Sequence, residues 1–291
     1  MCKSITAFAP AKINIGLKVF PKRQDCYHDI KSIFTVVNLR DELTVSLSGQ
    51  NNSCIVECDN FALPKENTFT KAYKAFCVLT GVCQGVCVKL VKHIPAGGGL
   101  GGGSSDASSF IQSLDILFDT HLTETSLDEI SSQVGSDVFF FTKALYSGCE
   151  NFTAVVQGRG DRVTQIEGRK DLHILLLFPG VSVSTKDAYA WIDERHQKEG
   201  FAADDAGSDI RSFVEEFNKP VRKWFFQNDF TAPVTAHFGE ISLALQALRQ
   251  CGADFVDMSG SGSSVFGIFK EVEKAQAAFQ ILSENWHAAL V

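Results

Sequence analysis

The sequence predicts an α+β protein of two domains. Its 291 residues exceed the length of one average domain. Apolar residues make up 45% and charged residues 21%, which are ordinary values for a globular chain and exclude wholesale disorder. Segments with the two-residue period of strands and segments with the helical period occur in both halves. This mixture favours two α+β domains, and we expect them to span residues 1–157 and 158–291.

The first half contains a strand, a glycine-rich loop and a helix in direct succession. Residues 42–48 alternate and predict a strand, residues 67–79 a helix, and the Val- and Ile-rich residues 86–94 a second strand that ends at Pro95. Six glycines then fall within the seven residues 97–103. Apolar residues follow at helical spacing: Ala107, Phe110, Ile111, Leu114 and Leu117. We expect Ser104, Ser105 and Asp106 to cap this helix and to supply its first-turn carboxylate.

A helix, two strands and a turn are predicted between residues 127 and 178. Residues 127–134 predict a helix, which Gly135 can end in a left-handed conformation. Residues 152–157 and 172–178 predict strands, and residues 158–161 between them a turn.

Beyond this point, helical stripes occur over residues 210–217 and 238–248. Residues 265–269 predict a strand, and residues 272–286 a closing amphipathic helix that ends near Trp286. The polar residues 198–207 predict a loop, and residues 259–263 a second Gly/Ser turn.

Charge and cysteine usage narrow the class of protein. The net charge is −7, and no cluster of Lys and Arg stands out, which argues against a nucleic-acid surface. No apolar run is long enough to span a membrane, and the first residues lack the apolar core of a signal peptide. The nine cysteines show no zinc-ligand spacing. We therefore expect a cytoplasmic protein with reduced thiols, without nucleic-acid or membrane partners.

The glycine run favours an anion site over a flexible hairpin loop. It satisfies the pattern G-x-G-x-x-G, but six glycines make that match nearly inevitable, and the acidic residue that a dinucleotide site requires is missing. The lysine of a nucleotide-binding P-loop is missing as well. Consecutive glycines nevertheless let backbone N–H groups approach an anion closely, and the N-terminus of the following helix favours negative charge.

Two charged residues lie in otherwise apolar surroundings. Lys12 interrupts an apolar strand candidate near the N-terminus, and it fits an edge-strand guard and a site residue equally well. Asp137 stands between a helix end and three phenylalanines. On pattern alone a turn or cap carboxylate fits it better, although a partly desolvated aspartate can also act as a general base.

Three sequence blocks occur in order: PAKIN at 10–14, PAGGGLGGGSSDA at 95–107 and MSGSGS at 258–263. Together they resemble the GHMP kinases, small-molecule kinases named for galactose, homoserine, mevalonate and phosphomevalonate. Further blocks resemble those members that phosphorylate a cytidine-diphosphate-linked methylerythritol, namely Tyr27-His28, GSDV at 135–138, PGVS at 179–182 and NDF at 228–230. The resemblance spans nearly the whole chain.

The resemblance implies an N-terminal ATP-binding domain and a C-terminal ferredoxin-like domain, with the active site in the cleft between them. It implies transfer of phosphate from ATP to the 2-hydroxyl of that substrate, with Mg²⁺, in non-mevalonate isoprenoid precursor biosynthesis. ATP would contact Asn67, Pro95, Gly97, Gly98, Gly99, Leu100, Gly101, Gly102, Gly103, Ser104 and Ser105. Asn67 would lie by the adenine, and Ser105 would bind the magnesium ion.

The same resemblance implies catalytic and substrate-binding residues. Asp137 would be the general base that takes the proton of the 2-hydroxyl. Lys12 would lie beside it, stabilise the emerging oxyanion and hold Asp137 ionised. The small-molecule substrate would contact Asn14, Tyr27, His28, Asp137, Gly260 and Ser261, with Tyr27 stacking on the cytosine and His28 at its polar edge. Further cytosine contacts are expected within residues 181–189.

The sequence departs from the family pattern in three places. Cys26 stands where the family usually has Gly before the Tyr-His pair, Phe139 where Pro usually follows Asp-Val, and Ser261 and Ser263 where Thr and Ala are common. Residues 186–227 match least, and no site is assigned to them. Two alternatives remain, a GHMP kinase of the homoserine or mevalonate type and a catalytically silent nucleotide sensor. We expect a monomer or a weak homodimer.

Overall fold

The computed structural model describes residues 4–59, 61–200 and 209–291. Contacts between Cα atoms divide the chain into two units, each built from separated segments. The first unit comprises residues 1–11, 38–96 and 101–150, and the second comprises residues 12–37, 97–100 and 151–291. The predicted domain boundary between residues 157 and 158 divides the sequence once, whereas these two units alternate along the sequence. The predicted boundary therefore stays a prediction.

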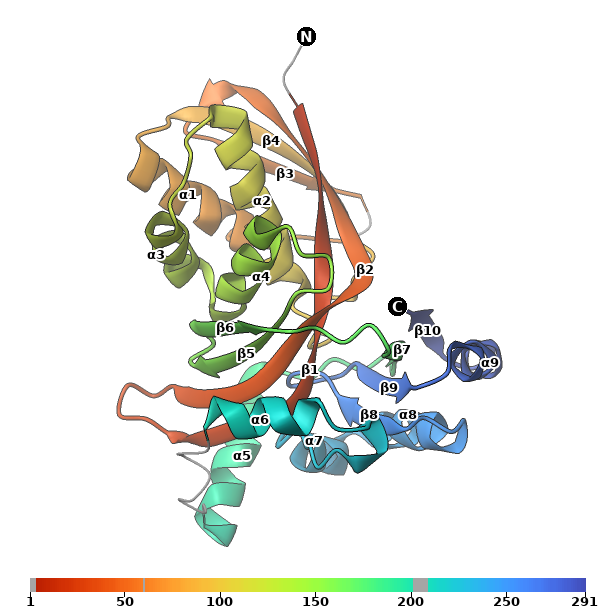
Figure 1. Cartoon of the computed structure of the whole chain (residues 1–291). Helices are drawn as coiled ribbons and strands as arrows, with labels where there is room; N and C mark the ends of the chain where they lie inside the picture. Colours follow the sequence, from red (N-terminus) through yellow and green to blue (C-terminus); the bar gives the residue numbers. More distant parts are fainter. Residues whose placement is uncertain (1–3, 60, 201–208) are drawn as a thin grey trace. The chain divides into compact units, whose positions relative to one another are not determined.

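The first unit packs four helices against strands of one sheet. The C-terminal half of β2 (His28–Asn51) pairs antiparallel with β4 (Gln84–Val91), and β4 pairs parallel with β3 (Cys54–Cys58). Figure 1 shows α1 (Thr68–Thr80), α2 (Gly102–Phe118), α3 (Glu124–Val134) and α4 (Ser136–Ser147) grouped beside these strands. Alternating residues of β2 and β4, such as Val45 and Val88, pack with Phe76 and Phe110 of the helices in one apolar core. This core fixes the start of α2, which the glycine run enters.

The second unit contains two groups of strands. The N-terminal half of β2 pairs with β5 (Thr153–Gly158), and β5 pairs with β6 (Arg162–Ile166). A four-stranded antiparallel sheet has the order β10-β7-β9-β8, formed by His287–Leu290, His173–Phe178, Val265–Phe269 and Phe255–Met258. β7 and β9 are almost entirely apolar because helices pack on them, mainly α8 (Gly239–Gln250) and α9 (Val272–Leu282).

The other helices among the described residues of this unit are α5 (Thr185–Glu199), α6 (Ile210–Phe217), α7 (Thr231–His237) and the 3₁₀ turn Val221–Lys223. The first strand, β1 (Ser4–Lys22), runs from one unit into the other along the chain.

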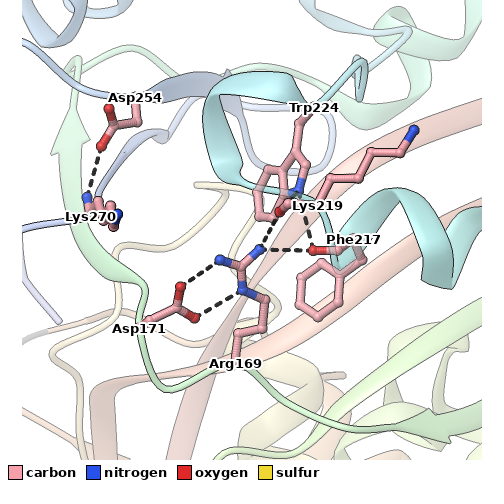
Figure 2. Close-up of polar contacts among 7 residues, drawn as sticks. All are labelled: Arg169, Asp171, Phe217, Lys219, Trp224, Asp254 and Lys270. Carbon is pink, nitrogen blue, oxygen red and sulfur yellow. Dashed lines mark hydrogen bonds and ion pairs between the residues drawn. The ribbon is translucent and has the colours of Figure 1, made fainter.

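An arginine closes the C-terminal end of α6 (Figure 2). Arg169 Nη1 donates to the backbone oxygens of Phe217 at 2.9 Å and Lys219 at 2.8 Å, and Nε and Nη2 bind the Asp171 carboxylate. Trp224 Nε1 donates to the same two backbone oxygens. A cationic donor at this position satisfies carbonyl groups that the helix itself leaves unpaired. The chain that follows α6 is thereby fixed.

Most predicted elements are confirmed. The structure contains the strands expected at 42–48, 86–94, 152–157, 172–178 and 265–269, although β4 ends at Val91, and the helices expected near 67–79, 107–117, 127–134, 210–217 and 238–248. The closing helix was predicted too long, because α9 ends at Leu282 and Trp286 precedes strand β10. The predicted loop at 198–207 lies largely within residues 201–208, outside the described residues.

Within the described ranges, no helix combines the length and the apolar character needed to cross a bilayer. The cysteines in that part of the chain form no disulfide bond.

Candidate active site

The glycine run alternates in its backbone conformation. Gly97, Gly99 and Gly101 have φ angles of +69°, +76° and +71°, in the left-handed region that other residues rarely adopt. A Cβ atom at Gly99 would lie 2.0 Å from the backbone oxygen of Ser259, so no larger residue fits. Left-handed residues that alternate with others can bring successive backbone N–H groups to one side, which creates an anion-binding concavity.

The start of α2 differs from its prediction. Its N-cap is Gly101, which makes no side-chain cap hydrogen bond, and the N–H groups of Ser104 and Ser105 donate to Gly101 O at 3.0 and 2.9 Å. The expectation that Ser104, Ser105 and Asp106 form the cap and a first-turn carboxylate was wrong, because left-handed Gly101 takes that position and the three residues lie inside the helix. No carboxylate occupies the first turn, so the positive end of the helix is available to an anion.

Two oxygens at the start of α2 have no hydrogen-bond partner among the described residues. They are Ser105 Oγ and Asp106 Oδ1, and both are buried. Buried oxygens of this kind usually bind water or a ligand. Mg²⁺ prefers oxygen ligands and is commonly held by one or two side chains together with nucleotide phosphates. No cluster of three or more His, Cys, Asp or Glu side chains in the described ranges could hold a metal ion alone. The hydroxyl of Ser105 is therefore suited to be one ligand of a magnesium ion whose other ligands are mainly phosphate oxygens.

A largely buried lysine between two aspartates supports the same helix start. Lys92 Nζ donates to Asp106 Oδ2 at 2.8 Å and to Asp41 Oδ2. Asp41 Oδ1 accepts the backbone N–H groups of His93 at 2.6 Å and Ile94 at 2.8 Å, directly before the glycine run. Burial opposes the charge on Lys92, but the two carboxylates outweigh it and raise its pKa. No local sequence pattern predicts this cluster, because its members are up to 65 positions apart.

The cluster predicts a dependence of stability on pH. Burial, with a contribution from Asp41 and against the opposing charge of Lys92, raises the pKa of Asp106 to about 7. The folded state thus holds this proton more tightly than the unfolded state, so the free energy of unfolding falls as pH rises from about 4 to about 7. We expect Asp106→Asn to reduce that fall by about 1–3 kcal/mol.

Urea unfolding of both proteins at about pH 5, 6, 7 and 8 measures the difference. Asp257, whose pKa burial raises to about 6, is present in both proteins, and its contribution cancels in the comparison. Equal pH slopes for the two proteins would show that Asp106 titrates in the same way in the folded and unfolded states.

In the second unit, Lys12 is part of a buried polar cluster on β1. Only 3% of Lys12 and 1% of Asn14 is exposed. Lys12 Nζ donates to Asn14 Oδ1 at 2.5 Å and to the backbone oxygen of Gly99 at 2.9 Å, and it lies 4.7 Å from the centroid of the Phe34 ring. Because this ammonium is buried, Lys12 does not protect an exposed edge strand from pairing with another chain, a role that requires an exposed lysine. A buried, hydrogen-bonded cation next to a glycine-rich loop is suited to stabilising negative charge.

The third sequence block packs on the glycine run within the same unit. A Cβ atom at Gly260 would lie 3.0 Å from the Gly99 backbone oxygen, and the N–H of Ser264 donates to Gly98 O at 3.1 Å. Ser261 Oγ lies 3.0 Å from Thr185 Oγ1, in an exposed position at the start of α5. The structure thus brings together Lys12, Asn14, Gly99 and Gly260 from three separated blocks.

The two residues predicted to bind the cytosine, Tyr27 and His28, follow a residue with a left-handed backbone conformation. Cys26 has a φ of +66°, which explains why relatives would carry Gly at this position. Tyr27 is 52% exposed, and the Arg159 guanidinium lies 3.6 Å from its ring centroid. His28 is buried, and its Nε2 lies 2.8 Å from Asp193 Oδ1.

The His28 ring also stacks on Tyr189, with centroids 4.7 Å apart. Tyr189 ends the stretch 181–189 in which further cytosine contacts were expected. Asp193 and Tyr189 lie on α5, a helix that was not predicted because it is mostly polar.

Other predicted site residues lie in the first unit. Asp137 lies in the first turn of α4 and is half-buried, and Gly135 is the N-cap of that helix. Gly135 ends α3 as predicted, but with an extended φ of 168° and not in the left-handed region. Asn67 caps α1, since its Oδ1 accepts Thr70 N at 3.1 Å and its Nδ2 donates to Pro64 O at 3.0 Å.

The chain matches two family models, for the N-terminal domain of GHMP kinases over residues 67–144 and for their C-terminal domain over residues 210–288. The 4-diphosphocytidyl-2-C-methyl-D-erythritol kinase of Treponema pallidum strain Nichols is 36% identical over 287 residues, which cover 98% of this chain and 96% of the relative. The chain belongs to the GHMP kinase family.

Solved structures agree with this assignment to the GHMP kinases. A 4-(cytidine 5'-diphospho)-2C-methyl-D-erythritol kinase matches with a TM-score of 0.76 and 28% identity, covering 98% of each chain. The homoserine kinase of Cytophaga hutchinsonii matches with a TM-score of 0.68 and 20% identity, covering 100% of this chain and 94% of its own. At that identity the second match supports the GHMP kinase fold alone.

Proposed function

We propose that this GHMP kinase transfers the terminal phosphate of ATP to the 2-hydroxyl of 4-diphosphocytidyl-2-C-methyl-D-erythritol, giving the 2-phosphate and ADP. The observation that carries the proposal is the buried ammonium of Lys12, held by Asn14 Oδ1 and Gly99 O directly against the glycine run. The nearly full-length match to a kinase of that name supports the choice of substrate.

The nucleotide is assigned to residues 97–105. Backbone N–H groups of the alternating glycines and of the start of α2 would bind its phosphates. Pro95 and Asn67 are assigned to its adenine side. Because the Asn67 side chain already caps α1, we expect it to act by shaping that end of the helix as well as by direct contact. Ser105 would hold a magnesium ion, which supplies positive charge to the phosphates when bound.

The reaction forms one bond and breaks one. The 2-hydroxyl oxygen bonds to the γ-phosphorus, the bond from that phosphorus to its bridging oxygen breaks, and ADP leaves. Asp137 accepts the hydroxyl proton as general base. Lys12 stabilises the negative charge that develops as the proton leaves. Positioning and charge compensation carry such a reaction, without a covalent enzyme intermediate.

The substrate is assigned to residues of several elements. Tyr27 would stack on the cytosine with the ring face opposite Arg159, and His28 would bind its polar edge, with Asp193 orienting the imidazole. Asn14, Gly260 and Ser261 are assigned to the methylerythritol side. Asn14 Oδ1 accepts a hydrogen bond from Lys12. The Asn14 side chain would therefore both hold the Lys12 ammonium and bind the substrate hydroxyls.

Replacement of Tyr27 tests the cytosine assignment. We expect Tyr27→Ala to weaken substrate binding by about 1–3 kcal/mol, as loss of a base-stacking aromatic ring does, and to leave the KM for ATP unchanged. Tyr27→Phe keeps the ring and should bind the substrate nearly as the parent protein does. Isothermal titration with the cytidine-diphosphate substrate measures both variants. Equal affinity of the Ala and Phe variants would place the cytosine elsewhere.

A panel of alcohols tests the function itself. Purified protein is mixed with ATP, Mg²⁺ and one of the diphosphocytidyl substrate, mevalonate or homoserine, and ADP is measured. We expect turnover on the first compound alone. Turnover on mevalonate or homoserine only would assign the chain to another GHMP kinase type. Absence of turnover on all three, with ATP still bound, would favour a silent nucleotide sensor.

Three further features belong to this proposal. We place the protein in the cytoplasm, as a monomer or weak homodimer, and divide it functionally into an ATP-binding part at residues 1–157 and a substrate-side part at residues 158–291. Sedimentation at several protein concentrations tests the oligomeric state.

A further inference from the structure

Ser259 shares its hydrogen-bond acceptors with Lys12. Ser259 Oγ lies 2.9 Å from the backbone oxygen of Gly99 and 3.3 Å from Asn14 Oδ1. These are the two oxygens to which Lys12 Nζ donates. Each carbonyl oxygen can accept two hydrogen bonds, so it can accept the ammonium and the hydroxyl together. The single O–H of Ser259 is shared between the two oxygens, of which Gly99 O is the nearer. Ser259 is fully buried, so bulk water does not compete for these contacts.

Asn228 fixes Ser259 from the other side. Its Nδ2 donates to the backbone oxygens of Met258 at 2.7 Å and Gly260 at 2.8 Å, the residues on either side of Ser259. Its Oδ1 accepts the N–H of Phe230 at 3.0 Å, which sets the orientation of the amide group. Both polar atoms of this side chain are therefore used, and the nitrogen holds the loop.

The segment that carries Asn228 is itself bound to β1. Leu17 donates its N–H to Gln227 O at 2.9 Å and accepts the N–H of Asp229 at 2.8 Å. Leu17 lies five positions after Lys12 on the same strand. Hydrogen bonds and the peptide bonds between them thus link β1 through Asn228 and Ser259 to the oxygens that hold the Lys12 ammonium.

We infer that Ser259 is a positioning residue for the phosphoryl transfer, which holds Asn14 Oδ1 and Gly99 O in place so that the Lys12 ammonium keeps a single position. The inference rests on the proposed role of Lys12. Ser259 makes no proposed contact with substrate and acts through Lys12 alone. Its loss therefore reduces kcat and leaves the KM of both substrates close to that of the parent protein.

Kinetics of Ser259→Ala and Ser259→Thr test this inference. We expect the Ala variant to lower kcat by about 3- to 10-fold, the effect of one buried hydrogen bond, with both KM values within about two-fold. The Thr variant keeps the hydroxyl and should restore kcat. Ser113→Ala is the matched control, since it removes a hydroxyl that is 1% exposed and donates to Ser109 O at 2.7 Å in α2. It should lower stability similarly and leave kcat unchanged.

A spectroscopic readout separates this inference from the proposed function. The side-chain NMR signal of Lys12 is assigned by its loss in Lys12→Met. We expect it to shift in Ser259→Ala, to return in Ser259→Thr and to stay in place in Ser113→Ala. A kcat for Ser259→Ala equal to that of the parent protein, or an unmoved Lys12 signal, would overturn the inference. If the parent protein phosphorylates no alcohol, the proposed function fails, and the NMR signal alone decides whether Ser259 positions Lys12.

Discussion

Replacing Asp137 with asparagine is expected to lower kcat by at least about 100-fold, because an amide cannot take the proton of the attacking hydroxyl. Asn keeps the size and the hydrogen-bonding shape of Asp, so substrate and nucleotide should bind with similar KM values. Asp137 lies in the first turn of α4, where a carboxylate is favoured by the helix dipole, so the variant should also unfold slightly more easily.

Steady-state ADP release measures the effect on kcat. Asp128→Asn serves as control, because Asp128 is another half-buried carboxylate of the first unit, on α3, without an assigned role. We expect this control to keep kcat. An Asp137→Asn enzyme with the parent rate would exclude Asp137 as the base and leave positioning as the source of the rate.

Replacing Lys12 with methionine is expected to lower kcat by about 100- to 1,000-fold, the usual effect of losing one group that stabilises transition-state charge in a water-excluded site. The ammonium is nearly fully buried and bound to two oxygens, so it is preorganised for that task. Methionine fills most of the space of lysine, which limits the effect on packing.

Lys31→Met is the matched control for the Lys12 experiment. Lys31 is also 3% exposed, and it lies on β2 with its Nζ 4.8 Å from the centroid of the Phe213 ring. We expect its replacement to affect stability more than kcat. Similar losses of kcat in both variants would show that any buried lysine of this unit matters, and that Lys12 has no specific role.

The local parts of the fold could be predicted from the sequence. The strand before the glycine run and the helix after it have clear hydrophobic periods and are punctuated by Pro95 and the glycines. Helix α4 was missed although it contains three consecutive phenylalanines, whereas other missed elements lack such signals. β8 has only four residues, β6 is an edge strand with exposed polar residues, and few residues of α5 are buried.

The long-range parts of the site could not be derived from residue patterns. Ser259 and Asn14 are separated by 245 positions, and no local pattern pairs them. The first-turn role expected for Asp106 failed for a similar reason, since its partner Lys92 lies in the loop after β4 and Gly101 takes the cap. The family resemblance supplied the roles of Lys12 and Asp137, but it did not indicate that Ser259 and Asn228 support Lys12.

The position of the new phosphate tests the central claim most directly. Carbon 2 of the substrate carries a methyl group in place of hydrogen, so a phosphate on its oxygen has no proton on the adjoining carbon. We predict that the product formed from ATP shows one new phosphomonoester signal in the ³¹P NMR spectrum, and that this signal stays a singlet without proton decoupling. A doublet or a triplet would place the phosphate on a secondary or primary hydroxyl, and the absence of a new signal would mean that this substrate is not phosphorylated. Any of these three results would contradict the proposed reaction.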